Sequence, residues 1–179
     1  PVIGGILAPV FGLRNSFFVA AGFYAVAFVV VTALYREPPR ADRGEKSWQK
    51  TPVASILAFE NFLLLMLVIF GLQMVDRSFG PILPLYLGEV GYAQTEVPVV
   101  AGVLFSVLAL TTAFGHHLSG RVLKHRTPRL VIVASVLTGA FALTVFTLSK
   151  DVWLMGISMA CVGLAIGTSI TTALAAGGA

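Results

Sequence analysis

Residues 16–35 form a run of twenty amino acids without one charged side chain, and the polar segment 36–40 ends it. An α-helix rises about 1.5 Å per residue, so this run spans about 30 Å, the thickness of the hydrocarbon core of a bilayer. Its length and its lack of charge predict a transmembrane helix. Further apolar runs of similar length cover residues 60–87, 98–118 and 130–149, and another begins at Val152.

The composition supports an integral membrane protein built from helices. Apolar residues make up 57% of the chain and charged residues only 11%, whereas a soluble domain carries about 25% charged residues. The single cysteine, Cys161, lies inside an apolar run, so the chain has no intramolecular disulfide. We therefore predict an all-α fold that crosses the membrane several times and is surrounded by lipid.

The basic residues alternate from loop to loop in the way that sets membrane topology. The linker at 36–52 holds five Lys and Arg residues and the loop at 119–129 holds four, while Arg14 and Lys150 stand alone in the other loops. Short loops rich in Lys and Arg stay in the cytoplasm, so we expect both basic loops there, in a multi-pass protein of the cell membrane. Nucleic-acid binding needs a basic face on a soluble domain, and we exclude that partner. Contact with anionic lipid is a compatible second role for these loops.

The third apolar run, residues 60–87, contains the charged residues that we place inside the membrane. Counted from Glu60, Asp76 lies sixteen residues along the helix, or about 24 Å, which is within the outer half of the core. A charge there costs about 2.5–3.5 kcal/mol, so it normally faces a cavity or a partner. Prolines further along deprive two carbonyls of their donors and break the span near its end. The candidates for a transport path are Gln73, Asp76, Arg77, Gly80, Pro81 and Pro84. The alternative is that both charges reach the outer headgroups.

The last run is rich in small residues that share one helical face, namely Gly156, Ala160, Gly163, Gly167 and Thr171. Gly163 and Gly167 form a small-xxx-small pair, which is typical of close helix packing, with a sliding surface as the functional alternative.

Two adjacent histidines, His116 and His117, end the fourth run beside a basic loop. They lack the i, i+4 spacing of a metal-binding pair. We expect them at the membrane interface, with a proton relay as the alternative.

Residues 1–5 combine a proline with two adjacent glycines. Glycine lets another helix approach closely and proline weakens the helical hydrogen bonds, so tight packing is the structural interpretation. The stretch also resembles the end of Gly-Pro-x-x-Gly-Gly, the antiporter signature in the fifth helix of drug/proton antiporters of the major facilitator superfamily. Pro1, Gly4 and Gly5 match this signature. Residues 12–18 are similar to the family's short external turn, with a leucine in place of the usual tryptophan.

A second motif resembles the basic loop that this family repeats, which is close to Gly-x-Leu-x-Asp-Arg-x-Gly-Arg-Arg. Leu118 and Arg121 match it, Lys124 and Arg126 keep its basic end, and Gly120 replaces the aspartate. The second copy of the loop is usually the degenerate one in the family. The resemblance implies that these five residues form a cytoplasmic gating loop, whose basic side chains can meet the last carbonyls of a helix. A loop that only sets topology is the alternative.

The resemblance covers the whole chain and implies a partial bundle of the major facilitator type, from the end of helix five to helix ten. Residues 1–35 then end the N-terminal six-helix bundle, and residues 60–179 begin the C-terminal one. Residues 36–59 form the cytoplasmic linker, with a short interfacial helix from about Val53. On this interpretation both ends of the sequence are cuts inside a longer protein, and the missing helices are partners of this segment.

The function that the resemblance implies is secondary active transport of a small solute by alternating access, with proton-coupled efflux as the leading interpretation. A symporter or a facilitator is the alternative within the family. A polytopic membrane enzyme would need clustered Asp, His or Glu at one membrane face, and a structural subunit would not need Asp76 and Arg77 in the membrane. No catalytic, cofactor-binding or metal-binding residue is predicted. The expected partners are lipid, a small-molecule substrate and protons.

Overall fold

The computed structural model describes residues 1–34 and 62–177. Within these residues the chain is helical and has no strand, and every helix contains a stretch long and apolar enough to cross a membrane. This confirms the expected all-α membrane fold. The linker at 36–59 and the helix expected from about Val53 lie outside the described residues. The helices are α1 (Val2–Leu34), α3 (Phe62–Val90), α4 (Val97–Val122), α5 (Pro128–Leu148) and α6 (Val152–Gly177).

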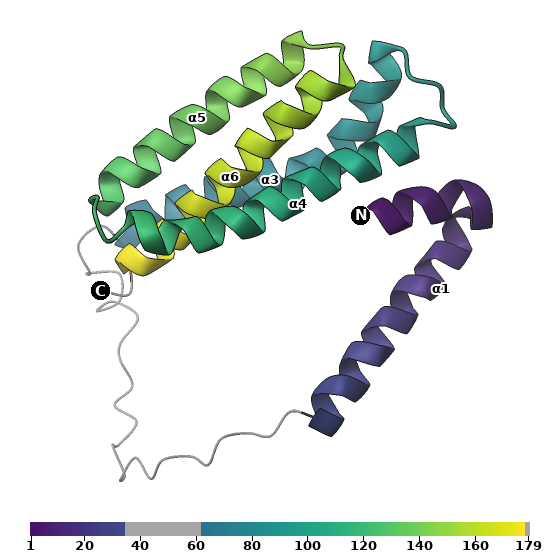
Figure 1. The fold of residues 1–179 in the computed structure, drawn as a ribbon, viewed down its shortest axis with the longest axis horizontal. Coiled ribbons are helices and arrows are strands. Elements are labelled where there is room, and N and C mark those ends of the chain that lie inside the picture. Colours follow the sequence, from purple (N-terminus) through teal and green to yellow (C-terminus); the bar gives the residue numbers. More distant parts are fainter. Residues whose placement is uncertain (35–61, 178–179) are drawn as a thin grey trace.

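Helix α1 consists of two limbs that meet at Gly12, inside the turn predicted from the sequence. Gly12 has φ 77° and ψ 158°, a backbone conformation that residues with a Cβ atom rarely adopt. The first limb lies beside the start of α4, and the second limb extends away from the other helices (Figure 1). The second limb, Arg14–Leu34, is mainly apolar after its first three residues and buries no residue.

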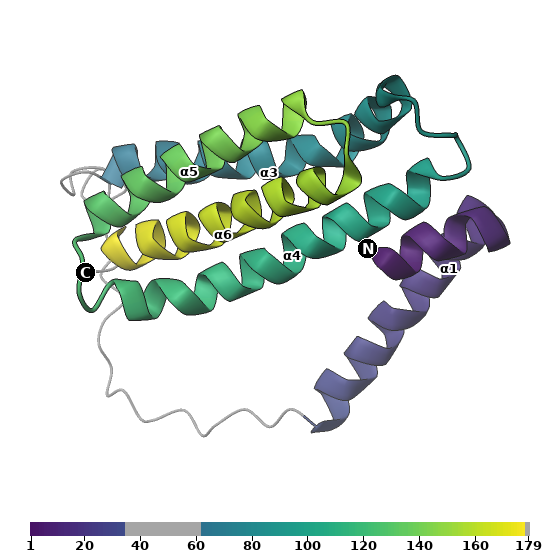
Figure 2. The same ribbon diagram turned by 45° about the horizontal axis from the view of Figure 1, so that its top comes forward.

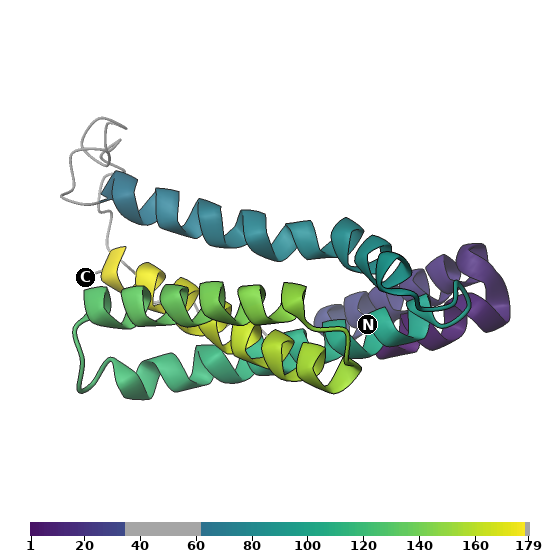
Figure 3. The same ribbon diagram turned by 90° about the horizontal axis from the view of Figure 1, so that it is seen from above.

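The other four helices form a bundle in which α6 is the central member. Helix α6 contacts α3, α4 and α5, and Figure 2 shows it between α4 and α5. Seen from above, α3 lies on the opposite side of α6 from α4 along much of its length (Figure 3). Helix α6 is also the most buried span, which its small residues permit because they leave room for three neighbours.

The close approach of α4 and α6 depends on glycines in both helices. A Cβ added at Gly163 would lie 2.6 Å from the carbonyl oxygen of Leu108, and one added at Gly115 would lie 2.7 Å from that of Leu164. A Cβ at Gly167 would meet the carbonyl oxygen of Thr112. The predicted packing face of the last span is therefore confirmed at Gly163 and Gly167. It does not extend to Gly156, where an added Cβ would meet nothing within 4 Å.

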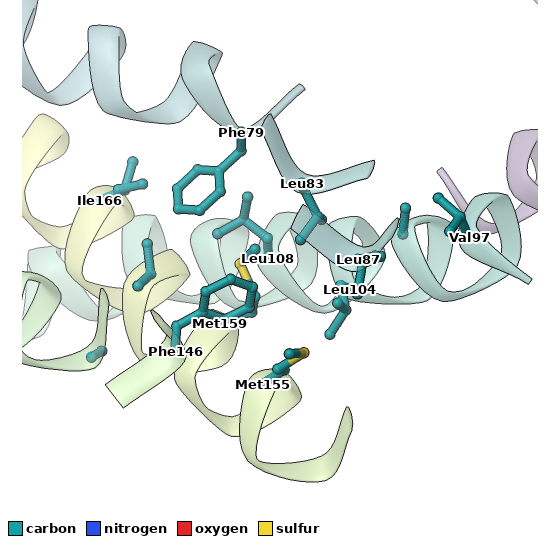
Figure 4. Close-up of a cluster of buried hydrophobic side chains, with 13 residues drawn as sticks. Phe79, Leu83, Leu87, Val97, Leu104, Leu108, Phe146, Met155, Met159 and Ile166 are labelled. Atoms are coloured by element: carbon teal, nitrogen blue, oxygen red, sulfur yellow. The ribbon is translucent and has the colours of Figure 1, made fainter. Parts of the chain in front are cut away.

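The buried apolar side chains gather where α3, α4, α5 and α6 converge (Figure 4). Met155 and Met159 of α6 are fully buried there, and flexible methionines fill such irregular gaps well. Helix α3 reaches this core only through its C-terminal part, residues 79–90, which we call the outer part after its expected side of the membrane. The main members of the core are Phe79, Leu83, Leu87, Leu104, Leu108, Phe146, Met155, Met159 and Ile166.

The prediction that Pro81 and Pro84 break the third span is wrong. Helix α3 continues through both prolines to Val90, three residues beyond the predicted end. Proline removes single backbone donors, but the remaining turns keep their hydrogen bonds, and burial of Phe79, Leu83 and Leu87 holds the outer part in place. The C-terminal part of α3 bends toward the start of α4 (Figure 3), and proline is a common cause of such bends.

Two tyrosines fasten the outer end of α3 to the loop between α5 and α6. The hydroxyl of Tyr86 donates to the carbonyl oxygen of Thr147 at 3.0 Å, and its ring centroid lies 5.4 Å from that of Phe146. The hydroxyl of Tyr92 lies 3.4 Å from the carbonyl oxygen of Lys150, to which it donates. The bond to Thr147 satisfies one of the last carbonyls of α5, which have no donors within the helix.

Candidate functional site

A cavity of about 630 Å³ lies between α3, α4 and the first limb of α1. Three titratable side chains from two helices line it, namely Asp76 and Arg77 of α3 and His116 of α4. The rest of the lining is mainly apolar and includes Phe105 and Leu108. Two other cavities, of about 560 and 340 Å³, lie between α3 and α5 and bring no acid and base together. The first cavity is therefore the candidate site.

Asp76 and Arg77 occupy the middle of a long helix. Asp76 is the central residue of the 29-residue α3, about 21 Å from either end. Asp76 is half-buried and Arg77 is exposed, and among the described residues the two do not form an ion pair with each other. Successive helical residues point about 100° apart, so adjacent charges are poorly placed to pair. Both remain available to a third group in the cavity.

The structure brings together half of the transport-path residues named from the sequence. Gly80 lies one turn beyond Asp76 and Arg77 and lines the same cavity. Gln73, Pro81 and Pro84 belong to the same helix but not to the lining of this cavity. Gln73 is exposed on α3, and the two prolines lie beyond the cavity toward the outer end of the helix.

His116 also lines this cavity, although the sequence interpretation placed it at the membrane interface with a proton relay as the alternative. Its side chain is exposed, and its Nδ1 lies 2.6 Å from Oγ1 of Thr171, so the ring is tied to α6. The residues of α4 that line the cavity recur at intervals of three and four, as in Phe105, Leu108, Thr112 and His116. That spacing marks a helical face, and it was the signal that could have assigned His116 to the cavity.

The first limb of α1 forms another wall, through the residues that match the antiporter signature. Pro1 lines the cavity, and the backbone N–H of Val2 donates to Oγ of Ser106 at 3.0 Å. A Cβ added at Gly5 would lie 3.2 Å from Cα of Gly102, so α1 and α4 approach each other backbone to backbone. Gly4 does not take part in this contact, because an added Cβ there meets nothing within 4 Å.

The predicted gating loop lies apart from the cavity. Helix α4 extends to Val122, four residues further than expected, so Leu118, Gly120 and Arg121 lie in its last turns rather than in a loop. The loop itself holds Lys124 and Arg126, both exposed. The helix persists because this stretch contains no proline, and its one glycine, Gly120, costs only about 1 kcal/mol in a helix. A role for these five residues in gating remains a prediction.

The family model described as the Major Facilitator Superfamily matches residues 1–178. The chain belongs to the major facilitator superfamily. This family consists of membrane transporters, and membership confirms the expectation that the chain is a transporter segment rather than an enzyme.

Curated relatives point to the same family at low identity. The chain is 24% identical to the multidrug resistance protein MdtG of Enterobacter lignolyticus over 169 residues, which are 93% of this chain and 40% of that protein. It is 29% identical to the multi-drug resistance efflux pump PmrA of Streptococcus pneumoniae over 137 residues, or 75% of this chain and 34% of the pump. The chain thus spans about two fifths or less of the length of these relatives. No solved structure matches it significantly.

Proposed function

We propose that this chain is part of a proton-coupled efflux transporter that exports small organic solutes by alternating access. The observation that carries the proposal is the cavity in which an acid and a base from the middle of α3 meet the apolar wall of α4. Ionised side chains inside a membrane are costly and mark substrate or proton paths. Family membership and the names of the multidrug relatives support the direction of transport.

The chemistry of the cavity favours amphipathic substrates. Phe105 and Leu108 offer an apolar surface, while Asp76 and Arg77 offer one negative and one positive charge. Binding sites for small molecules are mostly apolar and contain a few polar groups that fix the orientation of the ligand. An organic cation would pair with the carboxylate of Asp76, where a proton would compete with it, and this competition is the exchange that an antiporter requires.

The division of the chain at the linker gives the two moving parts. We assign residues 1–35 to the end of one bundle and residues 60–179 to part of the other, with 36–59 between them. The contact between the first limb of α1 and α4 then joins the two bundles beside the cavity. Rocking about such a contact would open the cavity to one side of the membrane at a time. The remaining helices of both bundles complete the transport path.

The test uses the intact transporter in proteoliposomes, with a pH gradient as the only driving force. Ethidium, a fluorescent organic cation, serves as the probe, and a pH-sensitive dye reports proton movement in the opposite direction. We expect ethidium to accumulate in vesicles with an acidic interior and to be released when an ionophore removes the gradient. An ethidium flux that does not depend on the pH gradient would indicate a facilitator. An ethidium flux in the same direction as the protons would indicate a symporter.

One pair of variants in α3 tests the site itself. Asp76→Asn should abolish gradient-driven accumulation while insertion remains normal, because loss of a charge from the membrane interior eases insertion. Glu89→Gln is the matched control, since Glu89 is an exposed acid of the same helix outside the cavity. Normal coupled transport by Asp76→Asn, on equal amounts of protein, would remove Asp76 from the proposed site.

A further inference from the structure

The hydrogen bonds around His116 define which ring nitrogen is free. Thr171 has one hydroxyl proton, and its Oγ1 donates that proton to the carbonyl oxygen of Gly167 at 3.0 Å. Its oxygen therefore accepts from His116, and Nδ1, at 2.6 Å, is the protonated nitrogen of the neutral ring. This assignment follows from the hydrogen-bond network. It leaves Nε2 with a lone pair and ready to accept a proton.

The backbone contact between α4 and α6 keeps this pair together. A Cβ added at Gly167 would lie 3.0 Å from the backbone nitrogen of His116, so α6 passes directly beside this turn of α4. Thr171 lies one turn after Gly167 and on the same face of α6. Thr171 is thus a positioning residue: it fixes the tautomer and the orientation of the imidazole without lining the cavity itself.

The other charged groups near His116 come from α3 and from α4 itself. Asp76 and Arg77 of α3 line the same cavity, and His117 and Arg121 follow His116 on α4. Helix α6 and the first limb of α1, residues 2–12, carry no acidic, basic or histidine side chain. With neutral His116 the two charges of α3 balance each other. A proton on Nε2 gives the cavity a net positive charge.

We propose that His116 is a proton-binding residue of the transport cycle, and that its protonation expels an organic cation from the cavity. The step adds one proton to Nε2 and breaks no other bond, since Nδ1–H continues to donate to Thr171. Histidine is the side chain whose charge ordinarily changes between pH 5 and 8, the range across which cell membranes maintain proton gradients. This inference rests on the proposed function and adds a second group, beside Asp76, to its proton chemistry.

The test measures ethidium binding to the purified intact transporter between pH 5.5 and 8.5, together with proton release in weakly buffered solution. In the wild type, affinity should fall about tenfold from pH 8 to pH 6, the factor expected when a unit charge appears about 10 Å away at an effective dielectric constant of about 20. His116→Gln and His116→Asn should bind ethidium with little dependence on pH and should release fewer protons. Two substitutions at this position guard against one that folds poorly.

Three further variants separate titration from packing. His117→Gln is the matched control, because His117 is exposed and outside the cavity, and it should keep the pH profile of the wild type. Thr171→Val should shift the midpoint of the profile, and Thr171→Ser, which keeps the hydroxyl, should restore it. A profile and a proton release equal to the wild type in both His116 variants would overturn the inference and leave the proposed function intact. A wild type without proton-coupled flux would overturn both.

Discussion

Substitution of Gly163 by alanine tests the backbone contact between α4 and α6. The new Cβ would lie 2.6 Å from the carbonyl oxygen of Leu108 and 3.1 Å from the backbone nitrogen of Thr112. An ordinary contact with a carbonyl oxygen needs about 3.4 Å, so the two helices must separate locally by about 0.8 Å. Overpacking of this kind costs about 1–3 kcal/mol, and the better helix propensity of alanine returns about 1 kcal/mol.

Gly156 provides a control on the same helix. An alanine there gains the same helix propensity, and its Cβ meets nothing within 4 Å. We expect Gly163→Ala to unfold several degrees below the wild type, and Gly156→Ala to match or exceed the wild type. The measurement is thermal unfolding of the purified intact transporter in detergent, followed by the loss of its monodisperse peak. Equal stability of the two variants would refute the inference that α4 and α6 meet through their backbones at Gly163.

Three further outcomes are expected. Cysteines placed at Thr95 and at Lys124, in a background with Cys161 replaced by alanine, should react with an impermeant reagent from opposite sides of sealed vesicles; labelling from one side would contradict the topology. Gly12→Ala should destabilise the protein by about 1–3 kcal/mol because of its positive φ, whereas Gly22→Ala in the same helix should be tolerated because a Cβ there meets nothing within 4 Å, and thermal unfolding would show the difference. Tyr86→Phe should lower stability by about 0.5–1.5 kcal/mol through loss of the bond to Thr147, and an unchanged unfolding temperature would argue against that bond.

The sequence was sufficient to predict the spans because hydropathy and charge act locally. Each helix had to be long enough to cross the bilayer, and the basic loops alternated along the chain. The turn at Gly12 and the packing face at Gly163 and Gly167 could be predicted for the same reason, since they follow from what glycine allows. Asp76 could be named as a candidate for the transport path because a charged side chain inside an apolar span normally faces a cavity or a partner.

The role of His116 could not be read from its own helix alone. Its position depends on Thr171, 55 residues later, and on how closely α4 and α6 approach. Hydropathy places a histidine near a span end at the interface, whereas its contact with Thr171 depends on how the helices pack. The continuity of α3 through its prolines was missed for a related reason. A prediction from the local sequence considers the hydrogen bonds that each proline removes. It does not include the burial of Leu83 and Leu87 against other helices, which stabilises the turns around the prolines.

Helix α3 is anchored near one end only, so a bend at its prolines would displace its two ends by different amounts. None of its residues from Phe62 to Ser78 is buried in the described structure, whereas Phe79, Leu83 and Leu87 are. A swing of about 10° at Pro81 would carry Phe62, about 28 Å away, through about 5 Å. The same swing would move Arg77, about 6 Å from the pivot, by only about 1 Å. Such a swing would therefore move the N-terminal end of the helix by the width of a side chain while Asp76 and Arg77 stay almost still.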